Sequence, residues 1–222
     1  MDKKYQIIAL IGESGAGKDT MQRETCLAHP LMFHPIVSCT TRPRRDNEID
    51  GCDYHFITLE DFTKKLLHEQ MLEAADFRDW FYGTPIDSLS KEKINIGVFN
   101  PAGIQTIVKD PRLNVLVVKL NCSDKERLIR ALSREECPDC AEICRRYFTD
   151  KEDFASLDLD YFIVESGAGT SSDLLNDNNT LLDEIENMWK ELDVDTAFDT
   201  IVRWESSMTK KAESEKDKDN ND

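Results

Sequence analysis

Gly12, Gly17 and Lys18 have the spacing of a phosphate-binding loop, which has the form G-x-x-x-x-G-K-[ST]. Glycines let backbone N–H groups turn toward phosphate oxygens, and a helix that follows adds the dipole of its N-terminus. The lysine amine would reach the outer phosphates. A glycine-rich turn that binds nothing is the other interpretation of this segment. The phosphate-binding interpretation selects Gly12, Glu13, Ser14, Gly15, Ala16, Gly17, Lys18, Asp19 and Thr20.

The residue after Lys18 departs from the loop pattern, because Asp19 stands where a serine or threonine is expected. Its backbone N–H can still donate to a phosphate, but its carboxylate would repel one unless it points away or faces Mg²⁺. Thr20 supplies a hydroxyl one place further on. Thr20, acting directly or through water, and Asp19 are therefore the candidate Mg²⁺ ligands. A G-K-x-T sequence is common in nucleoside monophosphate kinases, so Asp19 favours a small-molecule kinase over a GTPase or an ATPase motor.

The most specific stretch of the chain lies between Ser38 and Phe56. It begins with S-C-T-T-R-P-R-R and continues from Glu48 with E-I-D-G-C-D-Y-H-F. It resembles the nucleotide-binding segment of guanylate kinases, which reads S-x-T-T-R-x-x-R followed by G-E-x-x-G-x-D-Y-x-F. Glu73, Tyr82, Gly83 and Thr84 continue the family pattern at the expected spacing. The resemblance extends from the phosphate loop to about Val164, which is most of the folded chain.

The resemblance implies that a set of polar side chains binds GMP. Arginines and tyrosines would hold its phosphate, because the planar arginine fork meets phosphate bidentately and tyrosine hydroxyls add neutral donors. Glu73 would accept hydrogen bonds from the N1–H and 2-amino groups of guanine, which adenine lacks. Taken singly, each of these residues could be an ordinary surface or core residue. The prediction therefore rests on the whole set, with Arg42, Arg45, Tyr54 and Tyr82 at the phosphate and Ser38, Glu73, Thr84 and Asn100 at the base.

A second arginine group lies further along the chain. Arg130 and Arg134 are four residues apart on the expected helix, and Arg145 or Arg146 follows. By the same resemblance they match the arginines that close over the ATP phosphates and neutralise charge on the transferring phosphoryl group. A solvated helix face is the alternative. The predicted catalytic residues are Lys18, Arg130, Arg134 and Arg145.

The family pattern breaks at two places. The usual D-x-D-x-x-G is replaced here by Val98-Phe-Asn100-Pro-Ala-Gly103, so neither acid is present. The first acid normally helps to organise Mg²⁺ and its water, whereas Asn100 can still form a hydrogen bond to a base but carries no charge. Glu165 replaces the asparagine that usually follows the last strand. These departures indicate a divergent member of the family, and they leave open a nucleotide preference other than GMP.

Apolar runs and helix caps predict how these residues are positioned. The strand-like segments are Tyr5–Leu10, Pro35–Ser38, Asp53–Ile57, Ile94–Phe99, Asn114–Leu120 and Tyr161–Val164. The expected helices are Lys18–Ala28, a helix capped by Thr58 that runs to about Glu69 with Phe62, Leu66 and Leu67 inward, Gly103–Lys109, a helix capped by Ser123 that carries Arg127, Arg130 and Arg134, and Leu181–Leu192 with Leu181, Leu182, Ile185, Met188 and Leu192 on the sheet. Strands that alternate with helices imply a parallel α/β sheet.

The C-terminal part of the chain is polar. Ser166–Asn179 is rich in Gly, Ser and Asn and reads as a loop. Lys210–Asp222 has no apolar residue beyond Ala212, so we expect disorder there. One guanylate-kinase-like domain is thus expected over residues 1–209.

Composition limits the partners. The net charge of −16 argues against nucleic acid, and no apolar run approaches the roughly 20 residues of a membrane helix. Seven cysteines in a chain of this size suggest free thiols in a reducing compartment, so we expect a cytoplasmic protein, as a monomer or homodimer. Cys137, Cys140 and Cys144 could form part of a zinc site, but ordinary thiols are favoured because no fourth ligand is near.

Together these features predict a P-loop NTPase-type α/β fold, with helices on both faces of a parallel sheet, a nucleotide-binding subdomain inserted at about 38–90 and a lid at about 123–155. The resemblance implies phosphoryl transfer from Mg·ATP to GMP or dGMP. Two alternatives stay open: a kinase of another nucleoside monophosphate, and a non-catalytic guanylate-kinase-like module that binds protein. The intact loop glycines and Lys18 argue against the non-catalytic module.

Overall fold

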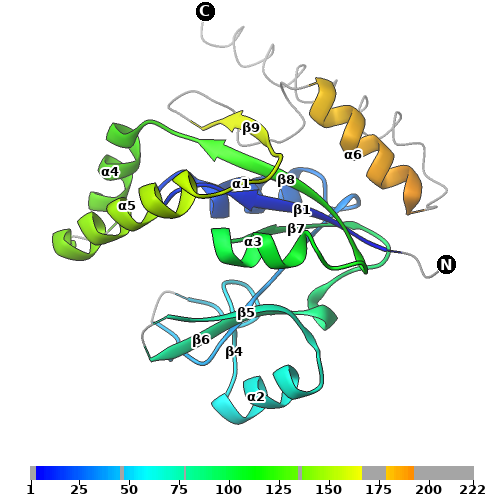
Figure 1. The fold of residues 1–222 in the computed structure, drawn as a ribbon, viewed down its shortest axis with the longest axis horizontal. Helices are drawn as coiled ribbons and strands as arrows, with labels where there is room; N and C mark the ends of the chain where they lie inside the picture. The colour runs from blue at the N-terminus through cyan, green and yellow to red at the C-terminus, as the bar shows by residue number, and fades with distance from the viewer. Residues whose placement is uncertain (1–3, 46–47, 78, 135–136, 167–178, 193–222) are drawn as a thin grey trace, which may run out of the picture.

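The computed structural model describes residues 4–45, 48–77, 79–134, 137–166 and 179–192. Its larger sheet has five parallel strands in the order β2-β7-β1-β8-β9 (Figure 1). The strands are β1 (Tyr5–Ile11), β2 (Phe33–Pro35), β7 (Ile94–Val98), β8 (Leu113–Asn121) and β9 (Phe162–Glu165). The predicted parallel α/β fold is confirmed.

Helices cover both faces of this sheet, as predicted. One face packs against α1 (Lys18–Ala28) and α6 (Asn179–Glu191), and its cluster includes Ile8, Leu10, Met21, Leu181 and Ile185. The other face packs against α3 (Pro101–Ile107), and its cluster includes Ile7, Ala9, Ile11, Ile104 and Ile107. Because successive side chains of a strand point to opposite faces, β1 is buried on both sides, and this explains its unbroken apolar run from Ile7 to Ile11.

A second sheet lies below the first (Figure 1). It has four strands in the order β4-β3-β6-β5, with antiparallel β5–β6 and β3–β6 pairs and a parallel β3–β4 pair. The strands are β3 (Cys39–Thr40), β4 (His55–Phe56), β5 (Met71–Phe77) and β6 (Trp80–Pro85), and the 3₁₀ turn η1 (Ile86–Ser88) follows. Of the residues predicted to bind a nucleoside monophosphate, Glu73, Tyr82 and Thr84 lie in the strands of this sheet, and Ser38 and Tyr54 directly precede β3 and β4.

The helix α2 (Leu59–Leu67) begins where the sequence predicts, since the Thr58 hydroxyl accepts a hydrogen bond from the Asp61 N–H. Phe62 is buried and its ring lies 5.6 Å from that of Phe81. The prediction that Leu66 and Leu67 face inward is wrong, because they are 43% and 77% exposed. The small sheet covers the turn around Phe62 but not the last turn of the helix.

The strand predicted at Pro35–Ser38 is also misplaced. The strand β2 ends at Pro35, and the extended chain from Ile36 to Ser38 crosses to the second sheet, where β3 begins at Cys39. Only the Ile36 N–H continues the ladder, by donating to the Ile96 carbonyl. The apolar residues of this stretch therefore mark a crossing between sheets, which periodicity alone does not distinguish from a strand.

Two helices, α4 (Asp124–Leu132) and α5 (Cys140–Ala155), pack on each other at one end of the large sheet (Figure 1). Ser123 caps α4 as predicted, by accepting a hydrogen bond from the Glu126 N–H. The prediction that Arg134 shares a helical face with Arg130 is wrong, because α4 ends at Leu132 and Arg134 lies in the turn beyond it. The chain has to reverse there to bring α5 back along α4.

At the C-terminus, Leu181, Ile185, Met188 and Leu192 are buried against the sheet as predicted, while the Leu182 side chain lies outside the described residues. Nearly all of the predicted loop at Ser166–Asn179 and all of Lys210–Asp222 also lie outside them, and Asn179 opens α6. Within the described ranges, none of the helices has the length and apolar character needed to cross a membrane.

Candidate active site

The loop between β1 and α1 has the backbone of a phosphate cradle. Gly15 and Gly17 have φ angles of 82° and 98°, a region that disfavours other residues. A Cβ on Gly15 would also lie 2.7 Å from the Arg127 carbonyl oxygen, so the loop is wedged against α4. The glycines are therefore required both by local backbone geometry and by close packing.

Lys18 lies inside the curve of this loop. Its Nζ donates to the carbonyl oxygens of Gly12 at 2.7 Å and Glu13 at 3.2 Å. Burial lowers the pKa of the ammonium group, and this effect outweighs the carboxylate of Asp19, which raises it. The amine is thus held by weak neutral acceptors, which a phosphate oxygen could replace with a full opposite charge.

The helices α4 and α5, called the lid helices here after the lid predicted for this segment, contact the loop. The Asp150 carboxylate of α5 accepts a hydrogen bond from the Ser14 N–H at 2.6 Å. Arg127 and Arg130 of α4 donate to the carbonyl oxygens of Ser14 and Gly15 at 3.2 and 3.3 Å. A carboxylate on a loop amide occupies the kind of position that a phosphate oxygen takes in such a cradle.

A polar network around the buried Arg127 joins the two lid helices. The Arg127 side chain is only 2% exposed and pairs with Asp124 at 2.9 Å. Asp124 also accepts from the Tyr147 hydroxyl at 2.7 Å and pairs with Lys151 at 2.9 Å. Hydrogen bonds from Lys151, then Tyr147 and Arg127, keep the pKa of Asp124 well below its usual range. The network fixes α5, and with it Asp150, relative to the loop.

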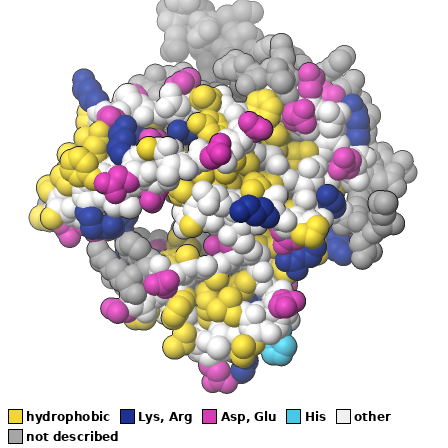
Figure 2. Space-filling model, in the orientation of Figure 1, with side chains coloured by type: hydrophobic (Ala, Val, Ile, Leu, Met, Phe, Trp, Pro, Cys, Tyr) yellow, Lys and Arg dark blue, Asp and Glu magenta, His cyan; other side chains and the backbone are white. Residues whose placement is uncertain are grey.

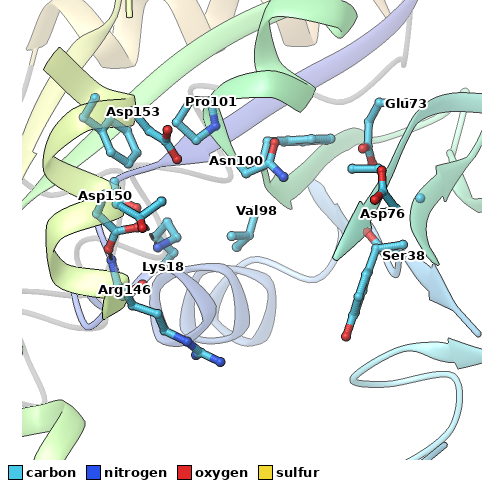
Figure 3. Close-up of a pocket in the computed structure, with 18 of the residues that line it drawn as sticks. Lys18, Ser38, Glu73, Asp76, Val98, Asn100, Pro101, Arg146, Asp150 and Asp153 are labelled. Carbon is cyan, nitrogen blue, oxygen red and sulfur yellow. Dashed lines mark hydrogen bonds between the residues drawn. The ribbon is translucent and has the colours of Figure 1, made fainter. Parts of the chain in front are cut away.

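A cavity of about 470 Å³ runs from the loop to the second sheet. In Figure 3, Lys18, Asp150 and Arg146 lie on one side, Ser38, Asp76 and Glu73 on the other, and Val98 and Asn100 between them. Figure 2 shows a hollow between the lid helices and the lower sheet. Several predicted residues therefore meet in one space: Gly12, Ser14, Lys18, Ser38, Tyr54, Glu73, Tyr82, Asn100 and Arg145.

The far end of the cavity holds a chain of polar groups. Thr84, which pairs with Glu73 across β5 and β6, donates its hydroxyl proton to Glu73 Oε1 at 2.7 Å. The Ser38 hydroxyl lies 3.1 Å from that of Thr84. Burial raises the pKa of Glu73, although the hydrogen bonds from Thr84 act in the opposite direction. Thr84 is itself buried behind Glu73, so its role here is to orient the carboxylate.

The side chains predicted to bind the monophosphate group are divided between two places. Tyr54 and Tyr82 line the large cavity, with ring centroids 5.9 Å apart. Arg42 lies over the Tyr54 ring, but Glu48 holds both arms of its guanidinium at 2.6 and 3.0 Å. Arg45 lines a second cavity of about 330 Å³, together with Ser14, Gly15, Arg134 and Arg146.

The lid arginines also differ from the predicted arrangement. Arg145 and Arg146 each bind Glu142 at 2.8 Å, and these two contacts lower the pKa of Glu142 to about 2. Arg146 lines both cavities, whereas Arg145 lines only the large one. The sequence left Arg145 and Arg146 as alternatives, and it selected neither Asp150 nor Arg127 for the site. The spacing of Arg146 and Asp150, four residues apart on one helix, was the available signal.

The candidate metal ligands have suitable chemistry. Asp19 and Thr20 are exposed in the first turn of α1, and they offer the hard oxygen donors that Mg²⁺ prefers. Burial raises the pKa of Tyr54 and the charge of Asp19 adds to this, so the charge of Asp19 acts at the cavity. Among the described residues there is no cluster of three or more His, Cys, Asp or Glu that could hold a metal. Cys137, Cys140 and Cys144 are exposed free thiols.

The structure shows the contacts of the residues that depart from the family pattern. Val98 lines the cavity and brings no charge to it. Asn100 caps α3 by accepting a hydrogen bond from the Gly103 N–H at 2.7 Å. Glu165 accepts from the Asn121 amide at 2.9 Å, near the end of the large sheet.

Comparison with known proteins gives a consistent result. The family model described as guanylate kinase matches residues 4–178. The guanylate kinase of Streptococcus agalactiae is 32% identical over 168 residues, which are 74% of this chain and 80% of the relative. That of Streptococcus pneumoniae is 33% identical over 165 residues, or 71% and 78%. That of Bacillus anthracis is 41% identical over 85 residues, so this chain spans less than half of its length, 42%.

A solved structure supports the same fold. The crystal structure of guanylate kinase from Anaplasma phagocytophilum superposes with a TM-score of 0.53, at 18% identity, and the match covers 86% of this chain and 87% of that one. At this identity the likeness concerns the fold alone, and the sequence relatives carry the assignment.

Proposed function

The chain belongs to the guanylate kinase family, and on that premise we propose that it transfers the γ-phosphoryl group of ATP to GMP or dGMP, giving ADP and GDP or dGDP. The observation that carries the proposal is the single cavity that contains Lys18 at one end and Glu73 at the other. A phosphoryl donor and a nucleoside monophosphate could therefore meet within it.

The donor end of the site is the loop. Its amides and Lys18 would bind the ATP phosphates, and Arg146 and Arg145 of α5 would neutralise charge on the group in transfer. Arg130, which contacts the Gly15 carbonyl, and Arg134, which lines the second cavity, would add positive charge beside the loop. Mg²⁺, held by Thr20 and Asp19 together with the phosphates, would shield the charge between donor and acceptor. No protein nucleophile is needed, because positioning and charge neutralisation supply most of the rate in such reactions.

The acceptor end is the second sheet. Tyr54 and Tyr82 would donate to the monophosphate, and Arg42 would join them by exchanging Glu48 for the phosphate. The ionised Glu73 would accept from guanine N1–H, and the Ser38 hydroxyl, which can rotate, would donate to the 6-oxo group. AMP offers Glu73 no donor, and a site built to pair such groups rejects a base that leaves them unpaired by about 10⁴-fold or more.

The same observations distinguish the proposed function from two alternatives. A protein-binding module needs neither a lysine held inside a glycine loop nor a buried carboxylate at the far end of the cavity. A kinase of another monophosphate would keep Lys18 and differ at the base. Location in the cytoplasm and a monomeric or homodimeric state stay predictions of the sequence.

The test is the initial rate of ADP formation with each ribo- and deoxyribonucleoside monophosphate, for the wild type and for Glu73→Gln. Wild type should prefer GMP or dGMP to AMP, CMP and UMP by orders of magnitude. Glu73→Gln should lose most of its rate with GMP and keep its weak rate with AMP, because glutamine presents a donor to the donors of guanine.

Asp76→Asn is the matched control, since Asp76 lines the same cavity from the same strand. It should keep the preference for GMP. A wild type that prefers adenine or a pyrimidine would contradict the choice of base. No ADP formation with any monophosphate would contradict the kinase proposal itself.

A further inference from the structure

Asn100 borders the base end of the cavity. It stands two residues after the end of β7 at Val98, and its side chain is exposed to the cavity beside Glu73 (Figure 3). The two side chains share one small space. A Cβ added to Gly103 would lie 3.2 Å from Asn100 Oδ1 and 3.4 Å from Glu73 Oε2. Any base that reaches Glu73 therefore also comes close to the Asn100 amide.

The orientation of this amide is determined by its neighbour. The Gly103 backbone N–H can only donate, so the atom that it contacts at 2.7 Å must be the amide oxygen. The amide nitrogen, Nδ2, is then the atom left to face the cavity. It makes no hydrogen bond to any other residue in the described part of the chain. Asn100 thus presents its N–H donors to a ligand, while its oxygen is turned toward the Gly103 N–H.

The Glu73 carboxylate has the opposite character. Its Oε1 already accepts from Thr84 at 2.7 Å, and Oε2 is turned toward the space beside Gly103. The base end therefore offers a hydroxyl at Ser38, an acceptor at Glu73 and a donor at Asn100. A complementary base edge has a carbonyl, then an N–H, and then a group that is not a donor.

Guanine fits only the first two of these groups. Its 6-oxo and N1–H groups match Ser38 and Glu73, but its 2-amino group has two protons. Glu73 can accept one of them. In a guanine that pairs with Ser38 and Glu73 in this way, the other proton would come toward the Asn100 amide and would meet another donor. Hypoxanthine has the same 6-oxo and N1–H groups and only a C–H at position 2, so it meets no such conflict.

We propose that Asn100 removes the selection for a 2-amino group, so that the site takes 6-oxopurine nucleoside monophosphates as a class, inosine monophosphate as well as GMP. The inference rests on the proposed function, because it concerns the acceptor of the same reaction. Asn100 would contact the base directly and determine specificity. Glu73 and Ser38 would still exclude adenine.

The test compares wild type with Asn100→Asp. Asparagine and aspartate are equally good helix caps, so one carboxylate oxygen keeps the Gly103 contact and the fold is preserved. The other oxygen then becomes an acceptor for the second amino proton of guanine. The measured quantity is the ratio of kcat/KM for GMP to kcat/KM for inosine monophosphate. Because the bond gained is to a charged group, we expect Asn100→Asp to raise this ratio by at least about tenfold.

A second readout separates this inference from the kinase proposal. Dissociation constants for GMP and inosine monophosphate, measured by calorimetry without ATP, should change in the same direction and do not depend on turnover. Asp76→Asn is the control and should leave the ratio unchanged. An Asn100→Asp ratio that is unchanged or lower, in turnover or in binding, overturns the inference. If binding ratios change as expected but no monophosphate is phosphorylated, the inference stands and the proposed reaction fails.

Discussion

The contact between Asp150 and the phosphate loop leads to a specific expectation about ATP. The carboxylate accepts from the Ser14 N–H at 2.6 Å, and its side chain is 20% exposed. If the loop amides bind phosphate oxygens, ATP has to displace Asp150 before the cradle is available. The protein without ligand is then in a state that competes with its own substrate. Asp150→Asn keeps the shape of the side chain and removes its charge.

The magnitude follows from the two kinds of hydrogen bond. A bond to a charged group contributes about 1.5–3 kcal/mol, and a neutral one about 0.5–1.5 kcal/mol. The substitution should therefore weaken the competing contact by about 1–1.5 kcal/mol, which is about five- to tenfold in affinity. The charge repulsion between Asp150 and bound phosphates is lost as well, and this acts in the same direction. We expect the dissociation constant for ATP to fall by about five- to tenfold.

The assay is calorimetric titration with a non-hydrolysable ATP analogue in the absence of any monophosphate. Asp153→Asn is the matched control, because Asp153 lies on the same helix and lines the same cavity. It removes the same charge, but its side chain makes no hydrogen bond to the loop. The control should change the dissociation constant by less than about twofold, since an exposed charge is largely screened.

An Asp150→Asn variant that binds the analogue with unchanged or lower affinity would refute this reasoning. The contact would then hold the loop in its binding conformation rather than compete with the ligand. An equal gain in both variants would assign the effect to overall charge and not to the hydrogen bond.

Three further expectations follow. Gly15→Ala should lower the free energy of unfolding, measured by denaturant titration, by at least about 2 kcal/mol more than Gly51→Ala does. Both glycines have positive φ, but only at Gly15 would the added Cβ lie 2.7 Å from a backbone oxygen. Equal losses would show that packing at the loop is unimportant. Burial raises the pKa of Glu73 above its ordinary value of 4.5. As pH falls, the preference for binding GMP over AMP should therefore decline at a higher pH than an exposed glutamate would give, and Glu73→Gln should show no such decline. A preference that persists down to the pH at which an exposed glutamate is protonated would contradict this. Asp19→Ala should raise the Mg²⁺ concentration needed for half-maximal rate, whereas an unchanged Mg²⁺ dependence would place Asp19 outside the metal site.

Much of the fold was predictable because local patterns decided it. The strand–loop–helix unit at Tyr5–Ala28 is marked by a continuous apolar run and then by glycines, and the Thr58 and Ser123 caps mark their helices by type and position. The errors arose where tertiary context decides. The exposure of Leu66 and Leu67 depends on how far a small sheet extends, and the end of α4 before Arg134 depends on the return of α5.

The candidate site shows the same division. The sequence brought Lys18, Ser38, Glu73 and Asn100 into one prediction, and the structure places them around one cavity. It could not predict that Asp150, distant in the chain, would contact Ser14. Nor could it predict which atom of Asn100 faces the cavity, because that depends on the Gly103 N–H.

Phosphorus NMR of a mixture of ATP, GMP, Mg²⁺ and the protein tests the central claim most directly, because it identifies every product. With the wild type, ATP and GMP should disappear together while ADP and GDP appear in equal amounts. Lys18→Ala should slow this conversion by at least about a hundredfold, as expected for the loss of a preorganised charge at the transferring group. ADP that appears with inorganic phosphate and no GDP, or a Lys18→Ala variant as fast as the wild type, would contradict the account.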